Sequence, residues 1–356
     1  MAYTTIDDPS KYFQTALYTG NGGTLSITND GNSNLQPDWI WTKERSGTSG
    51  NQNHTITDSS RGNTKQLFVN LPSADATSSA FVTSFDSDGF SLGDNANINN
   101  NSSTYVAWQW KCNGGTTETA VDESGSNPAN VRQTNTDAGF SIITYTGTGS
   151  AGTIAHGLGV APDWIIVKGR DIATDGMVYH GANTSAPETD ALTQPETSAT
   201  SDNAGWWNDT APTSSSVYIG THDRVNTDGK LFIAYCFASI QGYSKFGSYA
   251  GNGNADGAFI YTGFKPAFVI QKQTNADGEF WMMKDSTREP FNQTDANVYP
   301  NAQNAEVDTN GIDLLSNGFK CRTAGAGSNA DGATYIYIAF AESPFVSSEG
   351  VPTTAR

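Results

Sequence analysis

A pattern of three anchors, repeated along the chain, is the feature that most constrains its fold. The anchors are a Tyr-Thr-Gly tripeptide, a proline-led apolar run that ends near a lysine, and an aromatic-rich closing run. The tripeptides begin at Tyr18, Tyr145 and Tyr261, the apolar runs at Pro37, Pro162 and Pro266, and the closing runs contain Ala107, Ala234 and Ala339. From proline to alanine the separations are 70, 72 and 73 positions. This agreement predicts one unit in three diverged copies.

The interval between the tripeptide and the proline is less regular than the rest of the unit. It is 19 residues in the first copy, 17 in the second and only 5 in the third. Deletions are tolerated best in the connectors between strands. We therefore expect the third copy to lack most of one loop.

The unit is about 100 residues long, which exceeds a solenoid repeat and matches an independent domain. Asp-Gly pairs, which type I′ hairpin turns favour, recur along the chain, and no long window has helical apolar spacing. We predict an all-β fold of three tandem antiparallel β-sandwich modules, jelly-roll-like in character. The expected modules are residues 1–115, 137–241 and 242–345, with a linker or arm at 116–136 and a tail at 346–356. In the first copy we expect strands at 13–18, 39–43, 54–57, 66–69, 81–85, 89–92 and 104–110.

The closing runs are apolar at consecutive positions, as in Tyr335-Ile336-Tyr337-Ile338-Ala339-Phe340. A strand with one exposed face would instead alternate polar and apolar residues. The closing strands should therefore be central strands whose second face is covered by another layer or another subunit.

The formal charge of −17 and the pI near 4.4 argue against nucleic acid as a partner, because such binding depends on Lys and Arg neutralising phosphates. An acidic polar surface suits a protein that stays soluble at high local copy number. The three cysteines, Cys112, Cys236 and Cys321, have neither a disulfide framework nor metal-ligand spacing. No apolar stretch reaches the roughly 18 residues of a membrane span. The start lacks the pattern of a signal peptide, so we expect synthesis in a cytoplasm.

Two segments resemble parts of a catalytic site: Asp58-Ser59-Ser60-Arg61 and Asp285-Ser286-Thr287-Arg288. They lie 21 and 19 residues after their prolines, so they occupy equivalent positions. A serine hydrolase would also need a positioned base, and no histidine recurs beside both copies. We interpret each segment as an Asp–Arg pair that braces a loop, with hydroxyls closing the turns.

Metal chemistry has little support in the sequence. The four histidines, His54, His156, His180 and His222, show no ligand spacing. Asp86-Ser87-Asp88-Gly89 begins like a calcium loop, but Asn97 stands where an EF-hand needs glutamate. The sequence does not exclude a calcium site of another type. We predict no catalytic residues, no cofactor and no dedicated metal site.

The candidate binding residues are Trp206, Trp207 and Asn208, which lie in a polar segment, 193–216, without a strand pattern. Exposed aromatic rings on a loop can stack on sugars while neighbouring amides bond the hydroxyls. The alternative is that the two rings fill a domain interface or a trimer seam, because large apolar groups usually find a protein partner.

Several segments in combination resemble a repeat domain of unassigned activity found in structural proteins of marine bacteriophages. They are Met1-Ala2-Tyr3-Thr4-Thr5-Ile6, Leu17-Tyr18-Thr19-Gly20-Asn21-Gly22, Gln36-Pro37-Asp38-Trp39-Ile40-Trp41, Asp58-Ser59-Ser60-Arg61-Gly62, Phe85-Asp86-Ser87-Asp88-Gly89-Phe90 and Ile338-Ala339-Phe340-Ala341-Glu342-Ser343-Pro344-Phe345. The resemblance covers most of the chain and implies a virion component, most often a tail fibre or another surface protein. It transfers no catalytic residue. The second copy departs from the Asp-Ser-Ser-Arg segment and reads Val178-Tyr179-His180-Gly181.

We therefore expect a non-enzymatic virion protein, part of a tail fibre or the particle surface, that contributes to host recognition and attachment. Its partners would be other virion proteins and a host surface glycan or outer-membrane protein, but not nucleic acid. A homotrimer would combine weak contacts through effective concentration. The main alternative is a capsid decoration protein. A glycan-degrading tailspike is a third class, but it would need two acids spaced across one cleft.

Overall fold

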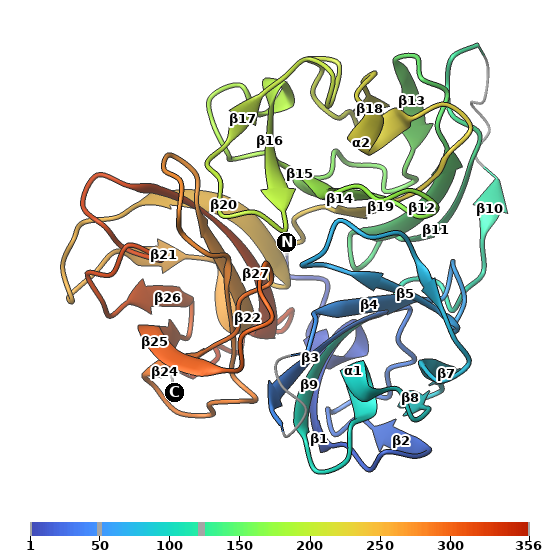
Figure 1. Cartoon of the computed structure of the whole chain (residues 1–356). Coiled ribbons are helices and arrows are strands. Elements are labelled where there is room, and N and C mark those ends of the chain that lie inside the picture. The colour runs from blue at the N-terminus through green and yellow to red at the C-terminus, as the bar shows by residue number, and fades with distance from the viewer. Residues whose placement is uncertain (1, 48–51, 120–124, 355–356) are drawn as a thin grey trace.

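The computed structural model describes residues 2–47, 52–119 and 125–354 (Figure 1). Strands make up 43% of the described residues and helices 4%, which confirms the prediction of an all-β fold. The α-helices of the described residues are single turns, α1 (Ala96–Asn99) and α2 (Asp223–Asn226). Two short 3₁₀ turns, η1 (Pro9–Lys11) and η2 (Pro187–Thr189), complete the helical part. The fold is therefore set by antiparallel sheets.

The N-terminal part of the chain forms a six-stranded sheet and a three-stranded sheet. The six-stranded sheet has the order β1 (Phe13–Thr19), β9 (Thr104–Trp110), β3 (Trp39–Ser46), β4 (Thr55–Asp58), β5 (Lys65–Phe68) and β6 (Ala76–Thr77). The smaller sheet has the order β2 (Leu25–Thr28), β8 (Gly89–Leu92) and β7 (Val82–Asp86). A buried cluster that includes Ile40, Ala107 and Phe90 lies between them. We call this unit the first sheet pair.

The middle of the chain forms the second sheet pair. Its large sheet has eight strands in the order β10 (Glu118–Thr119), β11 (Asn130–Asn135), β12 (Phe140–Thr146), β19 (Leu231–Phe237), β14 (Trp164–Gly169), β15 (Gly176–His180), β16 (Asp190–Gln194) and β17 (Ser201–Asp202). The small sheet consists of β13 (Gly152–Ala155) and β18 (Ser216–Ile219). A second buried cluster lies between the two sheets.

The C-terminal part forms the third sheet pair, with four strands in each sheet. One sheet has the order β20 (Ser244–Ala250), β27 (Thr334–Pro344), β22 (Phe264–Gln273) and β23 (Met282–Asp285). The other has the order β21 (Phe259–Tyr261), β26 (Gly318–Cys321), β25 (Val307–Leu315) and β24 (Thr294–Asn297). A third buried cluster separates them.

We call the six-stranded sheet, the eight-stranded sheet and the four-stranded sheet that contains β27 the three large sheets, because they share one strand order and one register. In each, the closing strand lies between an opening strand and a proline-led strand: β1-β9-β3, β12-β19-β14 and β20-β27-β22. The paired residues also correspond, because Trp39 lies opposite Trp110, Trp164 opposite Phe237, and Phe268 opposite Phe340. This shared register allows positions in one sheet to be compared directly with positions in the other two.

The register corrects the expected position of the third opening strand. Tyr249, not Tyr261, pairs and stacks with its closing-strand partner, as Tyr18 and Tyr145 do in their sheets. Tyr249 precedes Pro266 by 17 residues, the interval found in the second copy, so the predicted loop deletion was wrong. Alanine at position 250 replaces the threonine of the tripeptide, and Tyr261 belongs to β21 in the other sheet.

The turn after each opening strand is held in the same way in all three sheet pairs. A buried asparagine accepts a backbone N–H from the turn and donates its amide hydrogens to backbone carbonyls; these residues are Asn99, Asn226 and Asn329. Each turn contains a glycine with positive φ, namely Gly22 (67°), Gly149 (68°) and Gly253 (62°). Glycine adopts this conformation without steric cost, which explains its recurrence here.

The segment 116–136, expected to be a linker or arm, instead contributes two strands to the second large sheet. β11 pairs with β12 over six residues, and its Gln133 is buried. The Gln133 amide nitrogen donates to the hydroxyls of Ser59 and Ser60, at 2.8 and 2.7 Å. The part of this segment that forms β11 is therefore bonded within the protein, whereas residues 116–119 are exposed. Residues 120–124 lie outside the described part of the chain.

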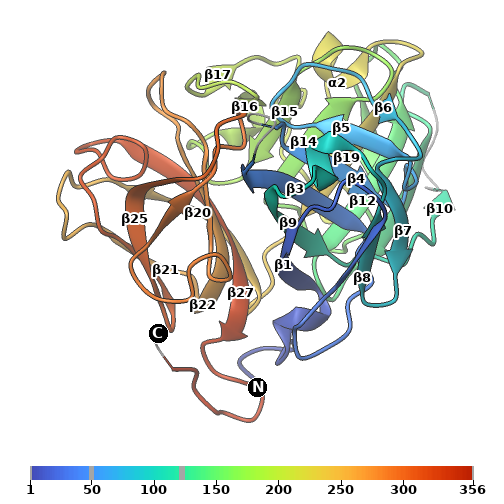
Figure 2. The same ribbon diagram turned by 60° about the horizontal axis from the view of Figure 1, so that its bottom comes forward.

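The C-terminal tail returns to the start of the chain (Figure 2). The backbone N–H of Ser348 donates to a carboxylate oxygen of Asp7 at 2.7 Å, and Val346 forms a β-bridge with Pro352. The described residues of the tail, 346–354, are therefore connected to the N-terminal segment.

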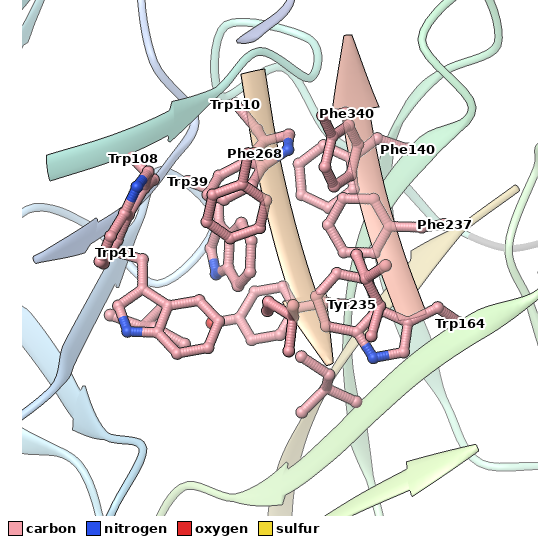
Figure 3. Packing of buried hydrophobic residues seen from close by; sticks show 14 of the residues in the cluster. Trp39, Trp41, Trp108, Trp110, Phe140, Trp164, Tyr235, Phe237, Phe268 and Phe340 are labelled. Carbon is pink, nitrogen blue, oxygen red and sulfur yellow. The ribbon is translucent and has the colours of Figure 1, made fainter. Parts of the chain in front are cut away.

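All three large sheets turn one face toward a common centre, where their side chains form a single central cluster. Trp110, Phe237 and Phe340, which occupy equivalent closing-strand positions, meet there with ring centroids 5.4 to 6.4 Å apart (Figure 3). The opposite face of each closing strand lies in the cluster of its own sheet pair. The prediction that closing strands bury both faces is thus confirmed, and the second layer comes from the same chain.

Candidate functional site

The three sheet pairs meet at three junctions, which we call seams: the first seam joins pairs one and two, the second joins pairs two and three, and the third joins pairs three and one. A backbone hydrogen bond crosses each seam at a corresponding place, and the second seam has another, from Gly278 N to Thr197 O at 3.1 Å. The donor and acceptor of the shared bond are Asp75 N and Arg170 O (2.7 Å), Thr200 N and Thr274 O (2.9 Å), and Glu306 N and Arg45 O (2.9 Å). Because this backbone contact is common to all three seams, side chains at corresponding positions can be compared.

The first seam is closed by buried charges. The Arg61 guanidinium donates to Asp58 at 2.5 Å and to Asp75 at 3.0 Å, and all three side chains are almost fully buried. The hydroxyl of Tyr235, from the second sheet pair, donates to Asp58 at 2.6 Å. Burial alone would lower the pKa of Arg61, but Asp58, Tyr235 and Asp75 raise it above its usual value. Arg61 therefore stays charged and holds the two sheet pairs together.

The third seam repeats this arrangement. Arg288 donates to Asp285 at 2.5 Å and to Glu306 at 2.9 Å, and Arg45 of the first sheet pair approaches Glu306 at 2.7 Å. The indole N–H of Trp108 donates to Asp285 at 3.0 Å. Burial would raise the pKa of Glu306, but hydrogen bonds and charge from Arg45 and Arg288 lower it. These groups also form a closed ion-pair network.

The second seam has neutral residues at the corresponding positions. His180 lies opposite Trp164 in the register that places Asp58 opposite Trp39, and Asn183 follows three residues later, where the other seams have arginine. The Thr200 hydroxyl donates to Asn183 at 2.8 Å, and the His180 ring nitrogen contacts the carbonyl of Tyr337 at 3.1 Å. Burial is the main cause that lowers the pKa of His180 to about 4, so its ring is neutral near pH 7. No guanidinium of the described residues occupies this seam.

A cavity of about 720 Å³ lies at the second seam. Asn183, Thr200 and Asp202 line it from the second sheet pair, and Tyr249 and Asn275 line it from the third. Asn183 is only 8% exposed, and its side-chain nitrogen has no hydrogen-bond partner among the described residues. The second seam therefore contains both a cavity and a buried amide nitrogen without a hydrogen-bond partner among the described residues, and it is the candidate functional site.

Buried lysines brace all three seams in an equivalent way. Each ammonium donates to a backbone carbonyl of the neighbouring sheet pair: Lys43 to Gln303 at 3.1 Å, Lys168 to Leu71 at 2.8 Å, and Lys272 to Thr197 at 3.2 Å. Burial lowers the pKa of each to about 8. Because their hydrogens are directed to carbonyl oxygens, we assign these lysines a structural role.

The predicted binding residues Trp206 and Trp207 do not form an exposed platform. They are 5% and 1% exposed and belong to the buried cluster of the second sheet pair. The Trp207 indole donates to the carbonyl of Asp190 at 2.9 Å, and the Trp206 ring lies 3.9 Å from the ring of His222. Asn208 is exposed, with φ of 55°. The segment folds back over its own sheet, so the sugar-stacking hypothesis for this tryptophan pair is corrected.

The Asp–Arg pairs expected in the two segments are confirmed, but the Ser59 hydroxyl donates to Asp38 at 2.6 Å and does not close the turn. The backbone N–H of Arg61 donates to Asp58 at 2.8 Å, and the same bond joins Arg288 to Asp285. What the sequence did not reveal is that each pair also reaches a neighbouring sheet pair.

The structure brings no metal-binding group together among the described residues, as judged by clusters of three or more His, Cys, Asp or Glu. In the calcium-like segment, Asp86 accepts hydrogen bonds from Ser84 and Ser91, and Asp88 accepts one from the backbone of Leu35. These carboxylates are therefore used within the hairpin and its neighbouring loop.

Sequence reasoning missed Asn183, Thr200 and Thr274 as site residues. The signal was present, because Val178-Tyr179-His180-Gly181 departs from the Asp-Ser-Ser-Arg segment of the other copies. That departure did not reveal which residues from a distant part of the chain meet Asn183. The pairing of Thr200 with Thr274 depends on how the sheet pairs pack.

The fold and its seams define a class: an all-β protein in which three sheet pairs share one central core. A family model described as "Domain of unknown function (DUF7483)" matches residues 8–344, and the chain belongs to this family. No curated protein and no solved structure matched the chain. In the part of the chain that the structure describes, no helix is long and apolar enough to cross a membrane.

Proposed function

We propose that this chain is a non-enzymatic structural protein of a bacteriophage virion, a tail-fibre or other surface component that contributes to host attachment. The proposal that the protein is not an enzyme is supported by the way in which the recurring polar residues are bonded. Asp58, Arg61, Asp285 and Arg288, the most enzyme-like residues in the sequence, are paired with one another in buried seams. A group held in this way has a structural role and no access to substrate. The virion part rests on the family resemblance.

We also propose that the three sheet pairs are diverged copies of one jelly-roll-like β-sandwich module. The support is the shared strand order and the three equivalent asparagines, Asn99, Asn226 and Asn329, in equivalent turns. Duplication would also explain why the seams correspond in backbone but differ in side chains.

Composition supports a role on the outside of a particle. The net charge of −17 disfavours contact with packaged nucleic acid and favours solubility at high copy number. The proposed partners are other virion proteins and a host surface glycan or outer-membrane protein. The homotrimer expected from the sequence stays a prediction. Burial of the closing strands does not require it, because the layer that covers them is supplied within one chain.

A capsid decoration protein is the second candidate, and the arrangement of the chain favours it. Three sheet pairs around one centre give a single chain approximate threefold symmetry (Figure 1). Such a body could contact three equivalent coat subunits at a local threefold point of a capsid, since symmetry of the contact surfaces favours closed assemblies.

Imaging of purified particles with copy counting tests this proposal. An antibody against the recombinant chain should label the particle, and density averaging should give its position and number. A few copies on the tail would support the fibre role, whereas hundreds on the head would support decoration. Absence of the chain from purified particles would contradict both.

A further inference from the structure

We propose that the cavity at the second seam binds a neutral carbohydrate. This inference rests on the proposed function, since it names the class of host-surface ligand that the protein would contact. The site lies between β16 and β17 on one side and the sheet that contains β20, β22 and β27 on the other.

The first argument is the contrast among equivalent seams. Arg61 with Asp75 closes the first seam, and Arg288 with Glu306 closes the third. At the second seam Asn183 and Thr200 make the corresponding contact through much shorter side chains. The cavity of about 720 Å³ is lined by both of them and falls within the roughly 300 to 1,000 Å³ typical of ligand pockets.

The second argument is the chemistry of the lining. Asp190 and Asp202 supply carboxylate oxygens, which accept hydrogen bonds from hydroxyl groups. Threonine and serine hydroxyls and the Asn275 side chain also line the cavity. The described lining residues include no Lys or Arg, so phosphates, sialic acids and uronic acids would be repelled. A neutral ligand rich in hydroxyl groups fits this set.

The third argument is the unsatisfied amide of Asn183. This side chain is more than nine-tenths buried, it lines the cavity, and its nitrogen lacks a hydrogen-bond partner among the described residues. A buried amide hydrogen without an acceptor costs about 1 to 3 kcal/mol, so such groups in proteins call for an explanation. The nitrogen has no accessible surface in this structure, so the Asn183 side chain has to turn toward the cavity before a sugar oxygen can supply the acceptor.

A divalent cation is a weaker fit for the same residues. Calcium takes six to eight oxygen ligands. Here one carboxylate oxygen of Asp190 already accepts a hydrogen bond from the Thr184 hydroxyl. No group of three or more metal-ligating side chains occurs in the described part of the chain. Binding of calcium alone is therefore an outcome that would contradict the proposal.

The test uses the full chain and four neutral probes: the methyl glycosides of glucose, galactose, mannose and N-acetylglucosamine. Saturation-transfer NMR at millimolar concentrations should detect at least one of them, and N-acetylneuraminic acid and calcium chloride serve as contrasting ligands. The double variant N183R/T200D copies the Arg–Asp pair of the first seam into the second. We expect it to fold and to lose the signal, because the guanidinium would fill the cavity.

A second variant keeps the shape of the site in case the first does not fold. Asp202 is exposed, and D202N removes one acceptor charge without changing side-chain volume. We expect it to bind the same glycoside at least tenfold more weakly. The proposal is overturned if no neutral glycoside gives a signal, if only calcium or the acidic sugar binds, or if N183R/T200D binds as well as the wild type.

Failure of this inference can be told apart from failure of the proposed function. A chain found on purified particles that binds none of the four glycosides would leave the virion role standing and remove the sugar site. Glycoside binding that N183R/T200D abolishes, in a chain that is absent from particles, would keep the site and remove the virion role.

Discussion

Arg61 and Arg288 are the residues on which the packing of the sheet pairs most depends. Each guanidinium is fully buried and joins a carboxylate on its own turn to a carboxylate at the seam. Buried ion pairs contribute little net stability when both partners are present, because desolvation offsets their attraction. Removal of one partner has a larger effect, since it leaves buried charge without compensation.

Replacement of Arg61 by alanine should therefore lower the free energy of unfolding by about 3 to 5 kcal/mol. Asn183→Ala is the matched control at the equivalent position of the second seam, and there we expect a loss of about 1 kcal/mol, the contribution of one neutral hydrogen bond. Urea denaturation at pH 7 measures both. Equal losses for the two variants would contradict the assignment of Arg61 as a seam residue.

The seam lysines predict an unusual dependence of stability on pH. Burial lowers the folded-state pKa of Lys43, Lys168 and Lys272 to about 8, whereas an unfolded lysine titrates near 10.4. Between these values the unfolded chain holds more protons, so stability must rise with pH. The urea midpoint should increase from pH 7.5 to pH 9, and Lys168→Met should reduce the slope. A midpoint that falls over this range would contradict the account.

Lys284 gives a separate prediction, because its ammonium is buried and has no hydrogen-bond partner among the described residues. Burial is the main cause that lowers its pKa to about 7. Lys284→Met keeps the side-chain length and removes the polar group, so it should raise the free energy of unfolding by about 1 kcal/mol or more. Thermal unfolding at pH 7 measures the change. A destabilised variant would show that the ammonium has a partner that this account lacks.

At the scale of elements, the closing strands were the part of the fold best predicted from sequence. Consecutive apolar residues required burial on both faces, and β19 shows how this is achieved. Ile233 points into the central cluster, whereas Phe232 points into the cluster of the second sheet pair.

Replacement of either Phe232 or Ile233 by alanine should therefore lower the free energy of unfolding by about 2 to 5 kcal/mol. Leu231→Ala is the control, because Leu231 begins the same strand and is 39% exposed, and it should cost less than about 1 kcal/mol. Chemical denaturation of the three variants measures the differences. If only one of the two buried positions proved sensitive, the strand would have a single buried face.

Strand positions in the first copy were also predicted closely, because alternation and Asp-Gly turns are local signals. The strands expected at 39–43 and 89–92 correspond to β3 (Trp39–Ser46) and β8 (Gly89–Leu92). The strand β11 was missed, since its polar side chains are satisfied by partners distant in sequence. The third opening strand was misplaced because Ala250 interrupts the tripeptide pattern, while Tyr261 repeats it in β21 of the other sheet.

The candidate site could be predicted only in part, for a related reason. Trp206 and Trp207 stand out in a polar segment, but burial depends on how that segment folds over its sheet. Asn183 and Thr274 are ordinary residues in sequence and become informative only when the seams are compared. Contacts between sheet pairs join residues separated by many positions, and no local pattern encodes them.

The whole molecule is a closed arrangement of three sheet pairs (Figure 1) around an aromatic centre (Figure 3). Every pair contacts both others through a seam, and the central cluster draws side chains from all three large sheets. No pair could be separated without exposing tryptophans such as Trp39 and Trp110 to water. Buried ion pairs close the first and third seams, whereas the second seam contains a cavity.

The central claim is that the chain folds as one unit and not as three independent domains. Differential scanning calorimetry of the intact chain tests this most directly, because it compares the calorimetric enthalpy with the van't Hoff enthalpy. Shared burial at the centre predicts a single transition in which the calorimetric enthalpy divided by the van't Hoff enthalpy is about 1. Two or three separable transitions, or a ratio near about 3, would show that the sheet pairs unfold independently and would contradict the account.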